Sequence, residues 1–365
     1  MSHSEKTFGH IRHHYWEWPI ASYLFLGGLG GGIFALTAIF TMFVFPEYFD
    51  LIGSIMAWPC FIAIACLGFG CFLLVFELGQ PLVFLRCFIR STSIICWGAR
   101  LLTVCIIFGL VWFCSYISWD WFLPVAEWLV PYRGFCLALA GLSGAGVILY
   151  TGIMLSSLKA HSFWATPALP VLFTISALST ACACITLSAG WWPVPFDYMN
   201  EGYVQQLILT GSPLAQDAYL TFAAQHEVVH LLHELDIILV VCEVVVLLVM
   251  VLSFLGAGNK TANRVAKKWV IGGWKFLFWG GMICGGLVLP EIFYLLPTGE
   301  GNEVLNFVNE ILAPAMVLCG GLLLRFMIVY SDERAPLPGE MTYYGRIKDH
   351  KALFLNRWVY GKNEF

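Results

Sequence analysis

Charged residues are scarce in this sequence. Only 12% of its 365 residues are Asp, Glu, Lys or Arg, whereas 59% are hydrophobic. A soluble domain usually carries about 25% charged residues, so the composition excludes an ordinary water-soluble fold. The formal net charge is −4, and we expect no nucleic-acid partner.

The sequence also lacks any C-x-x-C motif, although it contains 13 cysteines. Cys182 and Cys184 come nearest, as C-x-C. Single cysteines in apolar segments behave as small hydrophobic residues, and iron–sulfur clusters need several thiolates. We therefore expect no iron–sulfur cluster in this protein, so a partner subunit would have to carry one.

Histidines are too restricted in position to bind haem between helices. Of the nine histidines, those inside apolar spans all fall in one segment, 226–233. Two helices therefore cannot supply facing axial imidazoles. We expect no haem.

Long apolar runs recur along the whole sequence. Their lengths fit transmembrane helices, and the first run is too long for a removable signal peptide. The sequence predicts an all-α polytopic membrane protein with two four-helix bundles, 19–158 and 159–330, flanked by an N-terminal segment 1–18 and a basic tail 331–365. The eight expected spans are 19–44, 54–77, 96–118, 134–158, 167–188, 228–255, 270–294 and 307–330.

The loops carry opposite charges on the two sides of the predicted membrane. The side bearing both termini is rich in Lys and Arg, whereas the other side has one basic residue, Arg133, and several acids. Because positive charge stays cytoplasmic, we expect both termini inside, in a bacterial or archaeal cytoplasmic membrane. The long loop 189–227 is interpreted as an interfacial cap.

Five glycines interrupt the first span, at positions 27, 28, 30, 31 and 32. In lipid, small residues let helix backbones approach closely. They therefore favour tight helix packing, or room for a flat ligand beside the helix. The same residues with Ala35 also match G-x-G-x-x-A, but no strand precedes them, which argues against a dinucleotide site.

The sixth span is unusually rich in ionisable residues. Such groups are costly in lipid and mark function by default. Their depth is consistent with a proton path, and interhelical salt bridges to Arg100, Lys275 or Arg325 are the alternative interpretation. The predicted proton-path residues are His233, Glu234, Asp236, Glu243, Arg100 and Lys275.

The segment HEVVH at 226–230 matches the H-E-x-x-H zinc protease signature. That chemistry needs a third ligand and a glutamate-held water, and the sequence has no L-D-G motif to provide the ligand. We expect no metal site, and an intramembrane zinc protease is kept as an alternative function.

Four segments in order resemble one family: W-P-x-x-x-Y-L-F-L-G-G-L-G-G-G near the start, 77–102, 150–181 and 235–248. Together they are similar to the NrfD/PsrC family, the haem-free quinone-handling membrane subunits of polysulfide and related respiratory reductases. The resemblance implies anaerobic electron transport with a quinone, menaquinone or a related one. It also implies two partners, a four-cluster ferredoxin-like iron–sulfur subunit and a molybdopterin catalytic subunit.

The resemblance further implies a quinone pocket between spans one, two and four, near the side bearing the N-terminus. The family tyrosine of the Y-x-G motif corresponds to Tyr150, whereas the family's Asn and His in span one correspond to Ile20 and Tyr23. Tyr23, Tyr150 and Glu77 also lie at similar predicted depths, and could exchange hydrogen bonds and protons with a quinone. We predict these three as catalytic residues, and as quinone-binding residues Tyr23, Gly27, Gly28, Tyr150 and Gln80.

We expect the iron–sulfur partner to dock at the end bearing the termini. The family places its catalytic partner outside the cytoplasm, whereas the charge distribution favours a cytoplasmic partner; docking of an acidic extracytoplasmic subunit on the basic loops is the alternative. The predicted docking residues are His13, His14, Trp16, Arg86, Arg90, His161 and Trp164.

The sequence thus predicts a haem-free membrane subunit that exchanges electrons between the quinone pool and an iron–sulfur partner, and that also translocates protons. It contains no complete active site for a terminal substrate. A non-redox ion transporter subunit is the remaining alternative.

The first prediction concerns haem. The purified complex is expected to show no b-type haem absorbance assignable to this subunit, because no two spans offer facing histidines. Reduced-minus-oxidised spectra of the complex measure this, and a bis-histidine haem signal that disappears with this subunit would contradict it.

Overall fold

The computed structural model describes residues 18–77, 93–117, 119–159, 161–191, 213–256, 260–296 and 303–331. Those residues contain eight helical segments long and apolar enough to cross a membrane, which confirms the predicted all-α polytopic architecture. The spanning segments are Trp18–Val44, Pro46–Val75, Ile94–Cys114, Leu123–Ser156, Ala168–Leu187, Ala223–Gly256, Phe276–Tyr294 and Val304–Val329.

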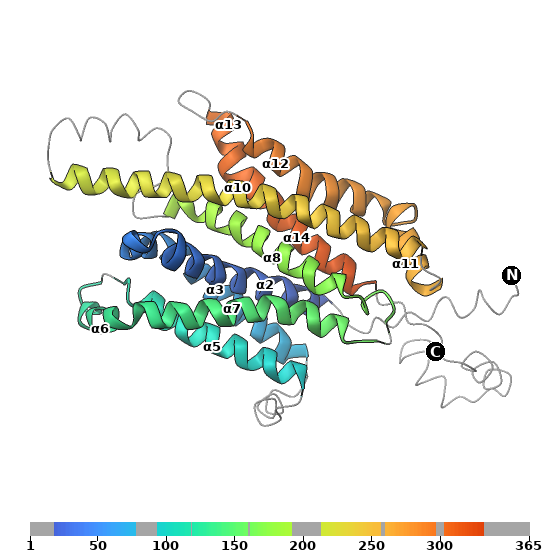
Figure 1. Ribbon diagram of the computed structural model, residues 1–365, viewed down its shortest axis with the longest axis horizontal. Coiled ribbons are helices and arrows are strands. Elements are labelled where there is room, and N and C mark those ends of the chain that lie inside the picture. Colours follow the sequence, from blue (N-terminus) through green and yellow to red (C-terminus); the bar gives the residue numbers. More distant parts are fainter. Residues whose placement is uncertain are drawn as a thin grey trace, which may run out of the picture.

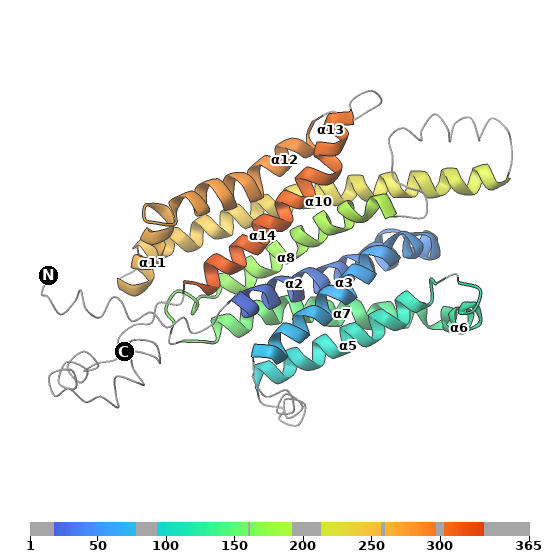
Figure 2. The ribbon, with the colours of Figure 1, turned by 180° about the vertical axis from the view of Figure 1, so that it is seen from behind.

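The helices form two groups side by side (Figures 1 and 2). The first group contains α2 (Trp18–Ile39), α3 (Phe49–Glu77), α5 (Ile94–Cys114) and α7 (Arg133–Ser156). A π-helical turn, η1 (Phe40–Val44), extends α2, and η2 (Pro46–Tyr48) leads into α3. The short helices between α5 and α7 are α6 (Leu123–Leu129) and η4 (Val130–Tyr132).

The second group contains α8 (Ala168–Leu187), α10 (Pro213–Gly256), a combined span of η6 and α12, and a last span that ends in α14 (Ala313–Val329). Helices α2 and α7 both contact α8, and α14 contacts α2, so the groups share a broad interface. The remaining elements are η5 (Ser188–Trp191), α11 (Lys260–Val270), η6 (Phe276–Val288), α12 (Leu289–Tyr294), α13 (Glu303–Phe307) and η7 (Val308–Leu312).

Helix α2 is the central helix. Its most apolar window is 83% buried, against 33% for the windows of α3, α5 and α10. The glycines explain this position. A Cβ at Gly31 would lie 2.7 Å from the carbonyl oxygen of Gly144 in α7, and a Cβ at Gly32 would lie 2.7 Å from that of Ala177 in α8. The glycines are therefore contact points with neighbouring backbones, as expected for membrane helices that pack through small residues.

Helix α10 is longer than predicted. It begins at Pro213 and runs for 44 residues, which at 1.5 Å per residue is about 66 Å and roughly twice the hydrocarbon thickness. The C-terminal part of the predicted loop 189–227 is therefore helical, and residues 192–212 lie outside the described residues. The polar composition of this part hid its helical structure from a hydropathy argument.

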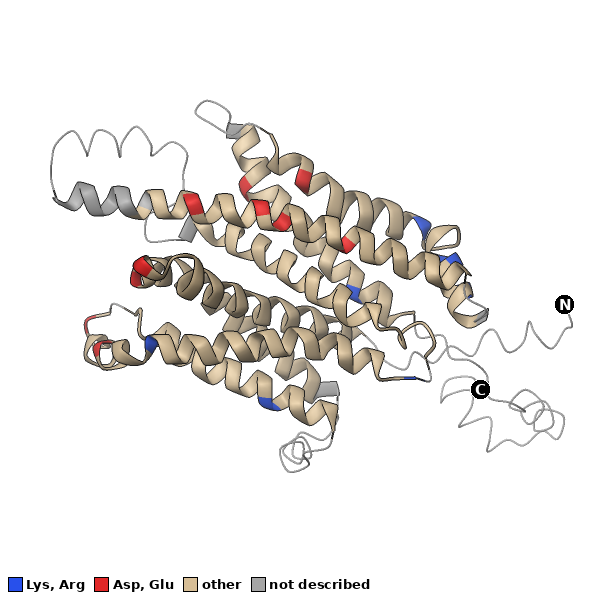
Figure 3. Ribbon diagram, in the orientation of Figure 1, with Lys and Arg blue, Asp and Glu red and all other residues tan. Residues whose placement is uncertain are grey.

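The basic segment before the seventh span is also a helix. Its buried Trp269 donates a hydrogen bond from Nε1 to Ser331 Oγ at 2.9 Å, which ties α11 to the end of α14. Figure 3 shows Lys and Arg mainly toward the end where α2 begins and α14 ends, and acidic residues on α10 and at the opposite end.

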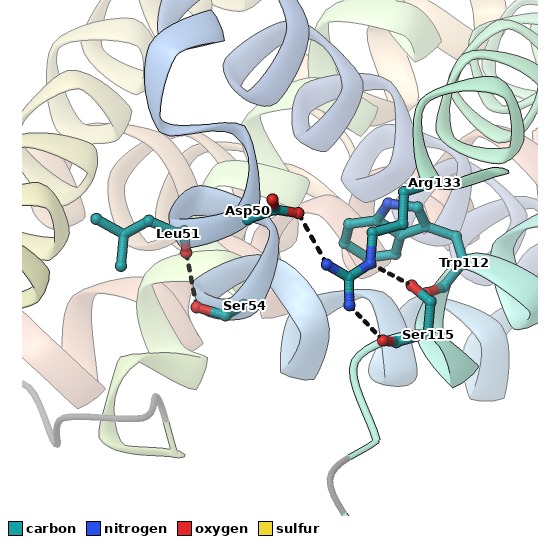
Figure 4. A network of polar contacts seen from close by, with 6 residues as sticks. All are labelled: Asp50, Leu51, Ser54, Trp112, Ser115 and Arg133. Carbon is teal, nitrogen blue, oxygen red and sulfur yellow. Dashed lines mark hydrogen bonds and ion pairs between the residues drawn. The ribbon is translucent and has the colours of Figure 1, made fainter. Parts of the chain in front are cut away.

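Arg133 is the exception at that opposite end, and it joins three parts of the first group (Figure 4). Its guanidinium donates to Asp50 at 2.8 Å and to the Ser115 hydroxyl at 3.0 Å, and lies 4.0 Å from the centre of the Tyr116 ring. Burial raises the pKa of Tyr116 above its usual value, although the neighbouring Arg133 opposes this shift. This basic residue is thus held by the protein's own groups.

The glycine contacts give a stability prediction. Gly31→Ala is expected to destabilise the protein by ~1–3 kcal/mol, because the added Cβ meets a backbone oxygen that cannot turn aside. Gly68→Ala is the matched control, since nothing lies within 4 Å of its added Cβ. Thermal unfolding of both variants in detergent measures the difference, and equal midpoints would contradict the backbone contact.

Candidate functional site

Two tyrosines meet where α2 and α7 approach each other near the end bearing Trp18. The side chains of Tyr23 and Tyr150 are only 2% and 5% exposed. Tyr23 and Tyr150 interact electrostatically, and the Tyr150 hydroxyl donates to Met154 Sδ at 3.1 Å. The structure therefore brings together the two tyrosines that the sequence singled out.

Glycines on two neighbouring helices lie against the two rings, and Gly98 makes room for the ring of Tyr150. Gly98 of α5 lies directly against the Tyr150 ring, so that an added Cβ would overlap it. Gly70 of α3 lies against Tyr23, where an added Cβ would be 3.5 Å from Cδ2. The corner is therefore built by α2, α3, α5 and α7. Sequence reasoning missed both glycines, although Gly98 lies within the second family-like segment.

The other predicted quinone residues fall differently. Gly27 faces Val147 and Thr151 of α7, on the same face of α2 as Tyr23. Gly28 instead faces α8, with Ala177 and the Arg325 guanidinium as the nearest groups. Gly28 therefore lies on a different face of α2 from the tyrosine corner, and the structure does not bring it together with Tyr23 and Tyr150. Helix α3 ends at Glu77, and the side chains of Glu77 and Gln80 lie outside the described residues.

A second set of polar side chains lies inside the second helix group. Asp236 and Glu243 of α10 are 1% and 3% exposed. Glu234 points outward instead, where its carboxylate lies 3.7 Å from His230, and both side chains are at least 60% exposed. The helix turn places Glu234 on the opposite face from Asp236, so the structure does not bring these two predicted proton-path residues together.

Arg325 of α14 is the basic partner of Glu243. Its guanidinium donates to Ser176 Oγ at 2.5 Å and to the Phe173 carbonyl at 3.1 Å. The Ser176 hydroxyl also bonds to Glu243, so it connects the buried acid to the buried base. Gly28 leaves the space beside the guanidinium.

Four further polar groups surround Asp236. The Ser179 hydroxyl of α8 lies next to its carboxylate, and Glu291 and Tyr294 of α12 interact with it electrostatically. The ring of His233 stacks on that of Tyr294 with centroids 4.3 Å apart. Sequence reasoning named His233 and Asp236 of this cluster, and it gave Arg325 as one alternative salt-bridge partner for the acids of the sixth span. Glu291 could also have been found, since it is an ionisable residue within an apolar span.

Arg100 and Lys275 do not belong to this set. Arg100 lies on α5 in the first helix group, 5.5 Å from the centre of the Trp97 ring. Lys275 is exposed before η6, 5.0 Å from the centre of the Phe276 ring. Neither residue is shown beside the α10 acids, where Arg325 lies instead, and their assignment to a proton path stays a prediction.

The HEVVH segment lies on the exposed outer part of α10. His226, Glu227 and His230 are all exposed, and the described residues contain no group of three His, Cys, Asp or Glu side chains placed to hold a metal ion. The geometry therefore provides no support for the zinc protease alternative.

Two predicted docking side chains are internal. Trp164 is completely buried and donates from Nε1 to the Ile328 carbonyl at 2.7 Å. The centres of the His161 and Trp164 rings are 4.4 Å apart. Both therefore hold the turn before α8 against the end of α14, and a partner could contact only the surface around them. The other predicted docking residues, His13, His14, Trp16, Arg86 and Arg90, lie outside the described residues.

These features define a polytopic α-helical membrane protein with a buried tyrosine pair in one helix group and a buried acid–base set in the other. The protein belongs to the family described as "Polysulphide reductase, NrfD", whose profile matches residues 6–192 and 214–333.

Curated relatives agree with this membership. The C subunit of polysulfide reductase from Wolinella succinogenes is 28% identical over 329 residues, covering 87% of this protein and 94% of the relative. Protein NrfD of Escherichia coli is 26% identical over 340 residues, covering 87% of this protein and 95% of the relative.

The buried acid–base set gives a further stability prediction. Arg325→Met is expected to cost ~3–5 kcal/mol, because it leaves Glu243 buried without its basic partner. The double variant with Glu243→Gln should recover part of this loss, whereas Lys275→Met at the exposed position should have little effect. Thermal midpoints in detergent measure all three, and strictly additive losses in the double variant would contradict the coupling.

Proposed function

We propose that this protein is the quinone-reactive membrane subunit of a respiratory oxidoreductase complex. It exchanges electrons between the quinone pool and an iron–sulfur partner, and a molybdopterin subunit carries the terminal chemistry. The observation that supports this best is the buried, interacting pair Tyr23 and Tyr150, in a member of the NrfD family.

The two tyrosines suit one end of a quinone. Because the two side chains interact in the same buried corner, we expect both to contact the same carbonyl oxygen rather than opposite ends of the ring. Tyr150 now donates to a thioether, which is a weak acceptor, so exchange for a carbonyl oxygen is favourable. When bound, the quinone accepts or supplies two electrons and two protons.

The tyrosine hydroxyls would orient the ring and hold the proton at that oxygen. Because Tyr23 and Tyr150 are both almost completely buried, binding requires the Tyr150 ring or its neighbours to shift. Glu77, the last residue of α3, and Gln80, three residues further along the sequence, stay predicted as groups that exchange protons with bulk water or contact the ring.

The end that bears the tyrosine corner is also the proposed docking end. Arg264 and Lys267 of α11 are exposed there, and this charge favours a cytoplasmic location for both termini. The opposing proposal, an acidic extracytoplasmic subunit docked on the basic end, is distinguished by protease access to the C-terminal tail in right-side-out and inverted vesicles.

We also propose that the second helix group carries protons. Asp236 and Glu243 lie about 10 Å apart along α10, buried and flanked by the hydroxyls of Ser179 and Ser176. His233 lies one helical turn before Asp236, toward the part of α10 where His226 and His230 are exposed. A non-redox ion transporter would use the same groups, but it would react with no quinol.

Tyr150→Phe tests the quinone function. The change removes a hydroxyl while keeping the ring packed on Gly98, so quinol-linked turnover of the complex should fall at least tenfold. Dye-linked activity of the soluble partner should be unchanged. Tyr132→Phe at the exposed opposite end is the matched control.

Unchanged quinol turnover in Tyr150→Phe would remove this tyrosine from the site. A complex that shows no quinol reactivity even in its wild-type form would instead favour the non-redox transporter.

A further inference from the structure

The cluster around Asp236 has more polar atoms than it has hydrogen-bond partners. Both carboxylate oxygens of Asp236, both of Glu291, the hydroxyls of Ser179 and Tyr294, and Nε2 of His233 are all buried without a partner of good geometry among the described residues. Buried polar groups are normally satisfied by protein, water or an ion. A set this dense, contributed by three helices, is unusual for a purely structural contact.

The unpartnered groups share one location. Asp236 lies next to Ser179 and interacts electrostatically with Glu291. Tyr294 interacts with both carboxyl groups. Ser179 and Asp236 are each 1% exposed and Tyr294 is 9% exposed. Helices α8, α10 and α12 therefore direct oxygen atoms toward a common centre.

The chemistry of this centre favours a single positive charge. Two acidic groups face each other, and neither forms an ion pair with a basic side chain within the described segments. Arg325 is already bound to Ser176 and the Phe173 carbonyl, beside Glu243. The carboxylate, phenol and hydroxyl oxygens are suited to hard cations, and the buried Cys182 thiol of α8 also interacts electrostatically with Asp236 and Glu291. The described residues offer no cluster of ligands typical of a transition metal.

We propose that Asp236, Glu291, Tyr294 and Ser179 form a loading site for one monovalent cation, a proton or a sodium ion, in transit through the second helix group. The inference rests on the proposed function and deepens it, because it assigns the ion-carrying step to a defined centre that includes α12. His233, stacked on Tyr294, flanks the site on the exposed side, and Glu243 with Arg325 flanks it on the other.

The test uses the whole complex reconstituted in liposomes and driven by quinol. Proton movement is followed with an enclosed pH dye, and sodium movement with ²²Na⁺, in parallel samples with and without Na⁺. Ion movement per electron is expected to fall at least tenfold in Glu291→Gln. Quinol turnover measured with an ionophore present should change less than twofold.

Control and companion variants separate the site from general effects. Glu47 is an exposed glutamate in η2, in the first helix group. The control variant Glu47→Gln should leave ion movement unchanged. Tyr294→Phe and Ser179→Ala keep the packing volume almost constant and should each lower ion movement at least threefold. Size-exclusion chromatography shows whether the complex assembles. If Glu291→Gln or Asp236→Asn does not assemble, Tyr294→Phe and Ser179→Ala test the loading site in their place.

Each outcome supports or overturns the inference. Loss of proton movement identifies the proton as the cation, and loss of ²²Na⁺ movement identifies sodium. Quinol turnover without any ion movement in the wild type would overturn the loading site but leave the quinone function standing. Undiminished ion movement in the folded site variants would also overturn it, whereas absent quinol turnover would reject the proposed function itself.

Discussion

The close approach of α2 to three neighbouring backbones is the contact on which the rest of the structure depends. Gly30, Gly31 and Gly32 place this helix against the main chains of α3, α7 and α8. No hydrophobic force joins helices in lipid, so such contacts replace it. Because one helix touches both groups, it fixes the tyrosine corner and the buried acid–base set relative to each other.

The tyrosine corner and the buried acid–base set lie against different faces of α2. Tyr23 and Gly27 face α7, whereas Gly28 faces α8 and leaves space for the Arg325 guanidinium. A shift of α2 would therefore be felt in both centres. This gives a physical basis for coupling between the proposed quinone chemistry and the proposed ion movement without a direct contact between their side chains.

The sequence alone did not show which ionisable residues of a span face the protein interior and which face outward. Glu234 and Asp236 are two residues apart in the same apolar span, yet one is exposed beside His230 and the other is buried beside Ser179. Arg100, Lys275 and Arg325 are all basic residues in or beside apolar spans, and only the last faces α10 among the described residues. Composition cannot separate such cases, because helix rotation and neighbour identity are set by packing.

The sequence by itself determined the membrane class, the eight spans and the family resemblance, because apolar run length and loop charge are local properties that a bilayer imposes directly. It also selected Tyr23, Tyr150, Asp236 and Glu243. Only the tertiary structure joined the two tyrosines, paired Glu243 with Arg325 through Ser176, and gathered Glu291 and Tyr294 around Asp236. Those contacts link residues far apart in the sequence, so they depend on which helices pack together and at what rotation.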